Sequence, residues 1–175
     1  MPTDLTPVAA ASARWLLTAY PPPPGAFSRA TAEAQALQAA TVAAALRYPA
    51  ALDVELLHLL GPGGSHHLDQ LSGTSDSADR ADAGQADWRT WVDDTVVSWA
   101  ACLLADPALA ARAHQAVAAT DHSGIAGDPR RLTLPAQRDT EAAPLLRHPD
   151  LLEPVATLHR PRLLALLTPE ASPLP

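Results

Sequence analysis

The stretch Trp88–Leu104, with the sequence WRTWVDDTVVSWAACLL, has the most regular amphipathic pattern in the chain. Its stripe positions follow the i, i+3, i+4, i+7 spacing that places side chains on one face of a helix. We therefore predict one continuous helix over 88–104, buried at the centre of the protein, with the other helices packed around it. The stripe consists of Trp88, Trp91, Val92, Thr95, Val96, Trp99, Ala100, Leu103 and Leu104.

The composition of the chain favours helices over strands. Its 175 residues include 38 Ala and 27 Leu but only 8 Val and one Ile, and strands prefer β-branched residues. The length suits one domain with one core. We predict an all-α fold: a single compact helical domain over 1–175, built as a bundle of five or six helices with two long irregular loops.

Cap residues and prolines divide the rest of the chain into helices and connections. Thr6 and Asp106 are each followed by a proline, which is favourable at the first position of a helix. We expect helices over about 6–20, 28–48, 51–60, 106–119 and 150–167, the last one kinked or divided at Pro161. We expect long loops over about 61–86 and 120–147, where glycines and prolines interrupt the pattern, and a frayed tail over 168–175.

The chain is acidic, with a formal net charge of −7, and it contains no lysine. Because it has no basic run, it lacks a surface that would neutralise phosphates, and anionic lipid headgroups would repel it. We therefore expect no nucleic acid and no membrane among its partners. Much of the negative charge comes from one segment, whose acids are Asp69, Asp76, Asp79, Asp82, Asp87, Asp93 and Asp94.

Cysteine content and the N-terminal residues favour a cytoplasmic location. The one cysteine, Cys102, cannot form a disulfide within the chain. The N-terminal residues lack the basic segment of a signal peptide. No apolar run approaches the roughly 20 residues that span a bilayer.

Histidines near the middle of the chain are the main candidates for metal or substrate binding. The run GGSHHLD contains His66, His67 and Asp69, and flexible glycines can direct two imidazoles and a carboxylate at one divalent cation. His58 and His122 are the candidates that would complete such a site. Two alternatives stay open for this run: a polar loop without a ligand, and a loop that contacts a partner.

Glu55 and His58 form a Glu-x-x-His pattern, which places both side chains on one helix face as in di-iron carboxylate bundles. Such a centre needs a second copy of the pattern and two further carboxylates, and the chain has no second copy. We interpret the pair as a solvent-facing polar stripe beside the apolar face that contains Leu52, Leu56 and Leu59.

Two pairs of like-charged residues are further candidates. Asp93 and Asp94 can bind Mg²⁺, but in a continuous helix Asp94 falls opposite the tryptophan stripe and Asp93 near its edge, which predicts a solvated face. Arg130 and Arg131 follow a turn and can clamp a carboxylate or phosphate of a ligand. Their alternative role is pairing with the Asp-rich segment 69–94 of this chain or of a second copy.

Two classes of function stay open. The chain has no G-x-S-x-G, P-loop or Rossmann pattern, and it has no complete catalytic constellation. We expect a non-enzymatic interaction or regulatory protein that acts through protein–protein contacts, with another protein or with itself as a homodimer. The alternative is a small helical enzyme or ligand-binding protein that uses His66 and His67 to hold a divalent metal or a small polar substrate.

Overall fold

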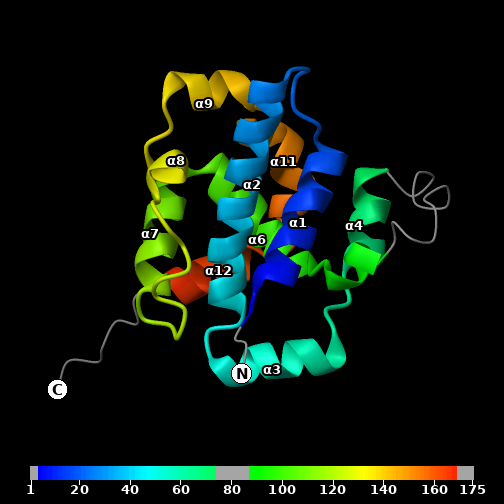
Figure 1. Ribbon diagram of the computed structural model, residues 1–175, viewed down its shortest axis with the longest axis vertical. Coiled ribbons are helices and arrows are strands. Elements are labelled where there is room, and N and C mark those ends of the chain that lie inside the picture. Colours follow the sequence, from blue (N-terminus) through cyan, green and yellow to red (C-terminus); the bar gives the residue numbers. More distant parts are fainter. Residues whose placement is uncertain (1–3, 74–86, 169–175) are drawn as a thin grey trace.

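A computed structural model describes residues 4–73 and 87–168 of the chain. Within these residues the secondary structure consists of eleven α-helices and one 3-10 helix, with no strand (Figure 1). The predicted all-α class is therefore confirmed. The helices are shorter and more numerous than the five or six that we expected.

The helices keep one numbering along the chain, in which η2 is the 3-10 helix (Figure 1). The long helices come first, and most of the short ones follow residue 130. Their bounds are α1 Thr6–Ala19, α2 Ala26–Arg47, α3 Ala51–Leu60, α4 Ser65–Ser72, η2 Asp87–Trp91, α6 Asp94–Ala105, α7 Pro107–Val117, α8 Arg130–Thr133, α9 Gln137–Ala142, α10 Pro144–Arg147, α11 Pro149–Ala156 and α12 Arg160–Leu167.

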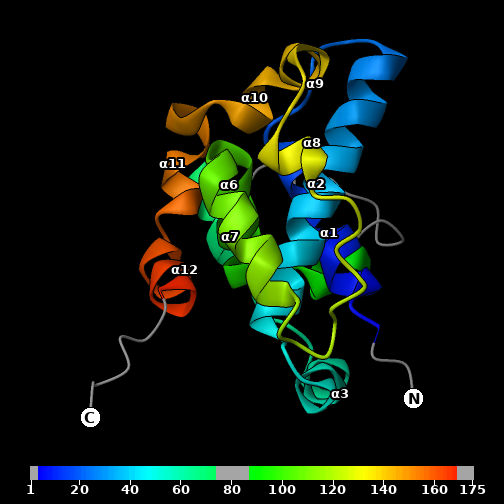
Figure 2. The ribbon, with the colours of Figure 1, turned by 90° about the vertical axis from the view of Figure 1, so that its left-hand side faces the viewer.

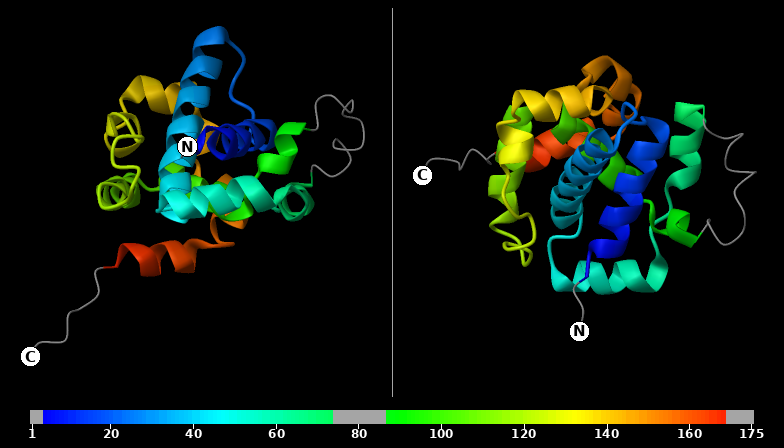
Figure 3. Two further views of the ribbon diagram at one scale, coloured as in Figure 1. Left: turned by 60° about the horizontal axis from the view of Figure 1, so that its bottom comes forward. Right: turned by 45° about the horizontal axis from the view of Figure 1, so that its top comes forward.

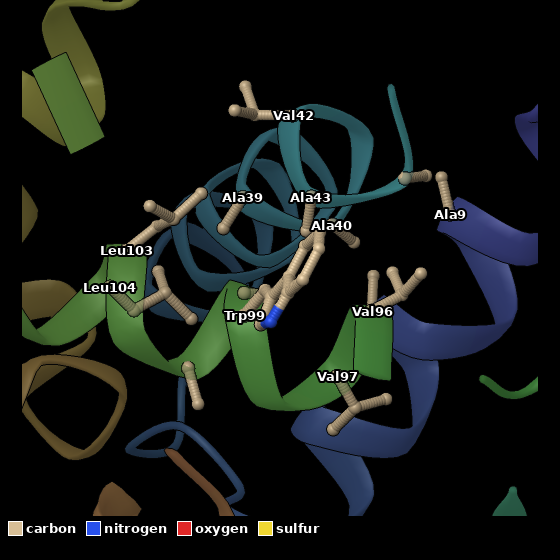
Figure 4. Packing of buried hydrophobic residues seen from close by; sticks show 14 of the residues in the cluster. Ala9, Ala39, Ala40, Val42, Ala43, Val96, Val97, Trp99, Leu103 and Leu104 are labelled. Carbon is tan, nitrogen blue, oxygen red and sulfur yellow. The ribbon is translucent and has the colours of Figure 1, made fainter. Parts of the chain in front are cut away.

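Helices α1, α2 and α6 form the centre of the protein. α1 and α2 lie side by side, and α6 packs against both. Ala39, Ala40 and Ala43 of α2 are fully buried, and Figure 4 shows the indole ring of Trp99 from α6 lying beside them. Because alanines let the helix backbones come close, the larger side chains of α6, Trp99 among them, fill the space between them.

Helix α6 is central, but the continuous helix predicted over 88–104 is wrong. Ten of the twelve residues of α6 are buried, yet this helix begins only at Asp94, and the residues before it form η2. The reason is Asp93, whose Oδ1 accepts hydrogen bonds from the backbone N–H groups of Thr95 at 2.8 Å and Val96 at 3.1 Å. An aspartate that caps these groups starts a new helix, although the apolar stripe continues across it.

The helix predicted over 150–167 is divided into α11 and α12, and side chains of α6 bind the break between them. Ser98 Oγ donates to the carbonyl oxygen of Ala156 and accepts from the N–H of His159, each at 3.0 Å. Trp99 Nε1 donates to the carbonyl oxygen of His159 at 3.0 Å. Pro161 lies in the first turn of α12, where its missing N–H costs no helical hydrogen bond. The expected division is thus present, just before the proline.

The two long loops predicted over 61–86 and 120–147 are only partly irregular. The first contains α4, and its residues 74–86 lie outside the described residues. The second contains α8, α9 and α10, each of four to six residues. Helices of one or two turns have too few residues to show an apolar period, so the pattern did not predict them. Of the tail expected to fray, only Thr168 is described.

Candidate functional site

Helix α3 lies at one end of the molecule, across the ends of α1 and α2 (Figure 2, and the right-hand view of Figure 3). Two of its ten residues are buried: Val54 is 0% exposed and Leu57 is 5% exposed. Asp53 Oδ2 accepts the N–H of Ala50 at 3.0 Å and stabilises the first turn. Gly61, with a φ of 69°, ends the helix. α3 is therefore well formed but packs on the protein through a narrow contact.

Four leucines of α3 form an apolar face that the described part of the chain leaves exposed. The structure buries the opposite side of the helix, which carries Val54 and Leu57. Full burial of a leucine side chain is worth about 1.5–3 kcal/mol, and these partly exposed leucines leave part of that free energy unrealised; a contiguous apolar patch indicates an interaction site. We call it the α3 leucine face; it consists of Leu52 (64% exposed), Leu56 (46%), Leu59 (80%) and Leu60 (82%).

A groove adjoins the α3 leucine face, between α3 and the start of α6. It has a volume of about 330 Å³. Leu56, Leu60 and Pro62 line its apolar side. With three carboxylates and one guanidinium in its lining, the groove is acidic. These charged residues are Asp53, Asp93, Asp94 and Arg47.

Asp93 holds the inner wall of this groove together. It is 6% exposed, and its Oδ2 accepts a hydrogen bond from the hydroxyl of Tyr48 while its Oδ1 caps α6. Arg47 Nε lies 3.9 Å from the same Oδ2. Burial, and then the charge of Asp93, raise the pKa of the Tyr48 hydroxyl, because both disfavour the phenolate. The solvated position expected for Asp93 is therefore wrong: the residue joins the end of α2 to the start of α6.

Asp94 also lines the groove, and it lies between two histidines. Its Oδ2 is 3.8 Å from Nδ1 of His67 on α4 and 3.4 Å from Nε2 of His159, the residue before α12. The Asp94 side chain is 25% exposed. His67 therefore lies beside a carboxylate, but neither Asp94 nor His159 belongs to the predicted metal set.

The other histidines of the predicted metal set have separate surroundings. His66 and His67 lie on helix α4 instead of a glycine-rich loop, and His66 is exposed. His58 Nε2 is 2.9 Å from the carbonyl oxygen of Asp4, and its ring packs edge-on against Trp91 with the ring centres 5.2 Å apart. His58 therefore helps to attach α3 to the N-terminal residues and to η2.

The last two members of the predicted set are buried in hydrogen-bond networks. Asp69 accepts hydrogen bonds from Trp15 Nε1 at 2.9 Å and from Arg89 Nη1 at 2.8 Å. His122 Nε2 is 2.8 Å from the carbonyl oxygen of Tyr48. Across residues 4–73 and 87–168, no three His, Cys, Asp or Glu side chains are grouped so that they could hold a metal ion. The metal site stays a prediction that the arrangement does not support.

Arg130 and Arg131 begin α8 and line a second cavity, of about 500 Å³, next to α2. Neither guanidinium forms an ion pair with an acid in the part of the chain that the structure describes. The alternative of pairing with the Asp-rich segment concerns partly undescribed residues, because Asp76, Asp79 and Asp82 lie outside the described ranges.

The site residues that the sequence did not reveal are those whose role depends on distant contacts. Tyr48 and Asp93 are 45 positions apart, and His159 and Asp94 are 65 apart, so no local spacing links them.

Within the described ranges, no helix is long and apolar enough to cross a bilayer. Comparison of the chain with known protein families, with curated proteins and with solved structures found no match.

Proposed function

We propose that this chain is a non-enzymatic protein-binding module and that the α3 leucine face, with its adjoining groove, is the contact surface. The observation that carries the proposal is the set of four exposed leucines on one side of a ten-residue helix. The buried residues of α3 are Val54 and Leu57, and His58 adds a contact with Trp91. Most of its apolar surface is therefore left for a partner.

The partner that fits this surface is a helical segment whose apolar stripe is flanked by arginines or lysines. A row of leucines on one helix accepts the ridge of a second helix. At 100° per residue, Asp53 and Glu55 fall on opposite sides of the α3 leucine face, and Asp94 adds a carboxylate in the groove. Arg47 lies beside Asp93, which leaves it little attraction for an acidic partner. Charge complementarity therefore favours a basic segment.

A second copy of this chain fits the surface less well. In a two-fold dimer the same patch meets itself, so Glu55 and Asp94 of one protomer approach those of the other. The whole chain carries a net charge of −7, and like charges at an interface oppose assembly. We therefore do not propose self-association through the α3 leucine face, and the experiment below distinguishes it from binding of a basic helical segment.

The test uses two synthetic helical peptides that share one leucine stripe, flanked by arginines in the first and by glutamates in the second. Fluorescence anisotropy measures the affinity of each. We expect saturable binding of the Arg-flanked peptide, and an affinity lower by about tenfold or more for the variant Leu59→Ser/Leu60→Ser. Leu166→Ser is the matched control, because Leu166 is an exposed leucine on α12; it should bind as the unaltered chain does.

Two results would contradict the proposal: equal binding of the Arg-flanked peptide by the double variant, or equal affinity for the Glu-flanked peptide. Light scattering over a concentration series tests whether a second copy of the chain binds the α3 leucine face. A dimer that is abolished by Leu59→Ser/Leu60→Ser, and not by Leu166→Ser, would assign the α3 leucine face to a second copy.

The alternative function, in which histidines hold a divalent metal or a polar substrate, has one place left for a test, although no described group of three ligands could hold a metal ion. His67 and His159 both lie within 4 Å of Asp94 Oδ2. Elemental analysis of purified protein tests this alternative. A transition metal present at one equivalent and lost in His67→Ala, but retained in the matched variant His66→Ala, would support metal binding at Asp94. Protein without metal, after incubation with Zn²⁺ and dialysis, would count against it.

A further inference from the structure

A cavity of about 500 Å³ is lined by residues of α2 and of the segment that carries α8 and the start of α9. Figure 1 shows these helices beside α2. This volume is within the roughly 300–1,000 Å³ of small-molecule sites. We propose that the cavity binds a small organic anion, an apolar body with one carboxylate or phosphate group, through Arg130 and Arg131. The lining opposite α2 consists of Asp128, Arg130, Arg131, Leu134, Ala136 and Asp139.

Hydrogen bonds hold the two walls of this cavity in place. On α2, the side-chain amide of Gln38 donates to the carbonyl oxygen of Asp128, and Gln35 Nε2 donates to that of Asp139 at 3.2 Å. From α10, Arg147 Nη2 donates to the carbonyl oxygen of Arg131 at 2.6 Å. These bonds fix the backbone on both sides of the arginines, so a ligand would bind to a largely preformed site, which lowers the entropic cost of binding.

Two guanidinium groups of the lining are available to an anion. Asp128 and Asp139 balance the formal charge of the two arginines in the lining, but both bond to the backbone: Asp128 Oδ1 accepts the N–H of Arg130 and Asp139 Oδ2 accepts the N–H of Ala136, each at 3.0 Å. The two guanidinium groups form no ion pair within the described residues. Segment 128–147 contains four arginines and three acids, so it has a net positive charge in an acidic chain.

The arrangement of the two arginines also suits an oxyanion. Consecutive side chains on a helix usually diverge, yet Arg130 and Arg131 both line this cavity. A guanidinium group presents parallel N–H donors that match the oxygens of a carboxylate or phosphate. Leu134 is 77% exposed, and with Ala34 and Ala136 it offers apolar surface to the body of the ligand. The predicted ligand therefore has a charged head and a compact apolar body.

The experiment measures binding of phenyl phosphate and benzoate to the full chain by titration calorimetry. Benzyl alcohol is the uncharged comparison, and inorganic phosphate is the head group without the apolar body. We expect saturable binding of at least one of the two aromatic anions and no saturable binding of benzyl alcohol. In Arg130→Gln/Arg131→Gln the affinity should fall by about tenfold or more, the effect of losing a charge-assisted hydrogen bond.

Arg138→Gln is the matched control, because Arg138 is an exposed arginine on α9 outside the cavity lining. It should bind the anion as the unaltered chain does, and circular dichroism should show the same helix content in all variants. The proposal is overturned if neither aromatic anion binds, if Arg138→Gln loses as much affinity as the double variant, or if inorganic phosphate binds as tightly as phenyl phosphate. The proposed role of the α3 leucine face does not depend on this result.

Discussion

Asp93 shows how much a single residue can change the structure expected from a pattern. The apolar stripe runs through it, but its backbone is extended, with φ −105° and ψ 121°, and its side chain caps α6, so a new helix starts there. The Asp-Asp-Thr sequence contains a cap signal, but the apolar periodicity that crosses it is longer and favours a continuous helix. The bond to Tyr48 comes from a helix that ends 45 positions earlier, and no local pattern reports such a contact.

Tyr48 leads to a prediction about pH. Its folded-state pKa is raised above the ordinary value of 10.0, first by burial and then by Asp93. A raised pKa contributes stability below the ordinary pKa, and that stability is lost as the pH rises above about 10. Urea unfolding between pH 8 and 11 should show this fall, and Tyr48→Phe should reduce its size. An equal fall in both proteins would show that Tyr48 is not its source. Tyr20→Phe is the comparison: burial alone raises the pKa of Tyr20, so its removal should reduce the fall by less than Tyr48→Phe does.

At the scale of the element, the sequence predicted where α3 lies but not which side of it is buried. Both sides are apolar, because Val54 and Leu57 oppose the α3 leucine face. Periodicity favours the side with more leucines, whereas the actual choice depends on how α3 meets η2 and the N-terminal residues. Local sequence likewise does not show that Ser98 and Trp99 of α6 form hydrogen bonds with the backbone at the break between α11 and α12.

The two sides of α3 should respond differently to substitution. Leu57→Ala removes a buried side chain and should lower the free energy of unfolding by about 2–4 kcal/mol. Leu59→Ser and Leu60→Ser change exposed side chains, so each should stay within about 0.5 kcal/mol of the unaltered chain. Urea denaturation followed by circular dichroism measures both effects. A large loss for Leu59→Ser or Leu60→Ser would show that the α3 leucine face is packed in solution.

For the whole molecule, composition predicted the helical class because that property sums over many residues. It could not predict which charged side chains meet. Arg130 and Arg131 were recognised as a pair from their neighbours in the chain, but the cavity that they line needs α2, about 90 positions away in sequence. His66, His67 and His122 were grouped by residue type, and the folded chain separates His122 from the other two by placing it against Tyr48.

The most direct test of the proposed protein-binding role is to locate the bound peptide on the protein. ¹⁵N-labelled chain is titrated with the unlabelled Arg-flanked peptide, and backbone amide shifts are followed by NMR. We expect the largest saturable shifts in 51–63 and at the start of α6, and we expect them to disappear in Leu59→Ser/Leu60→Ser. Shifts that centre elsewhere, or that persist unchanged in the double variant, would contradict the proposed role.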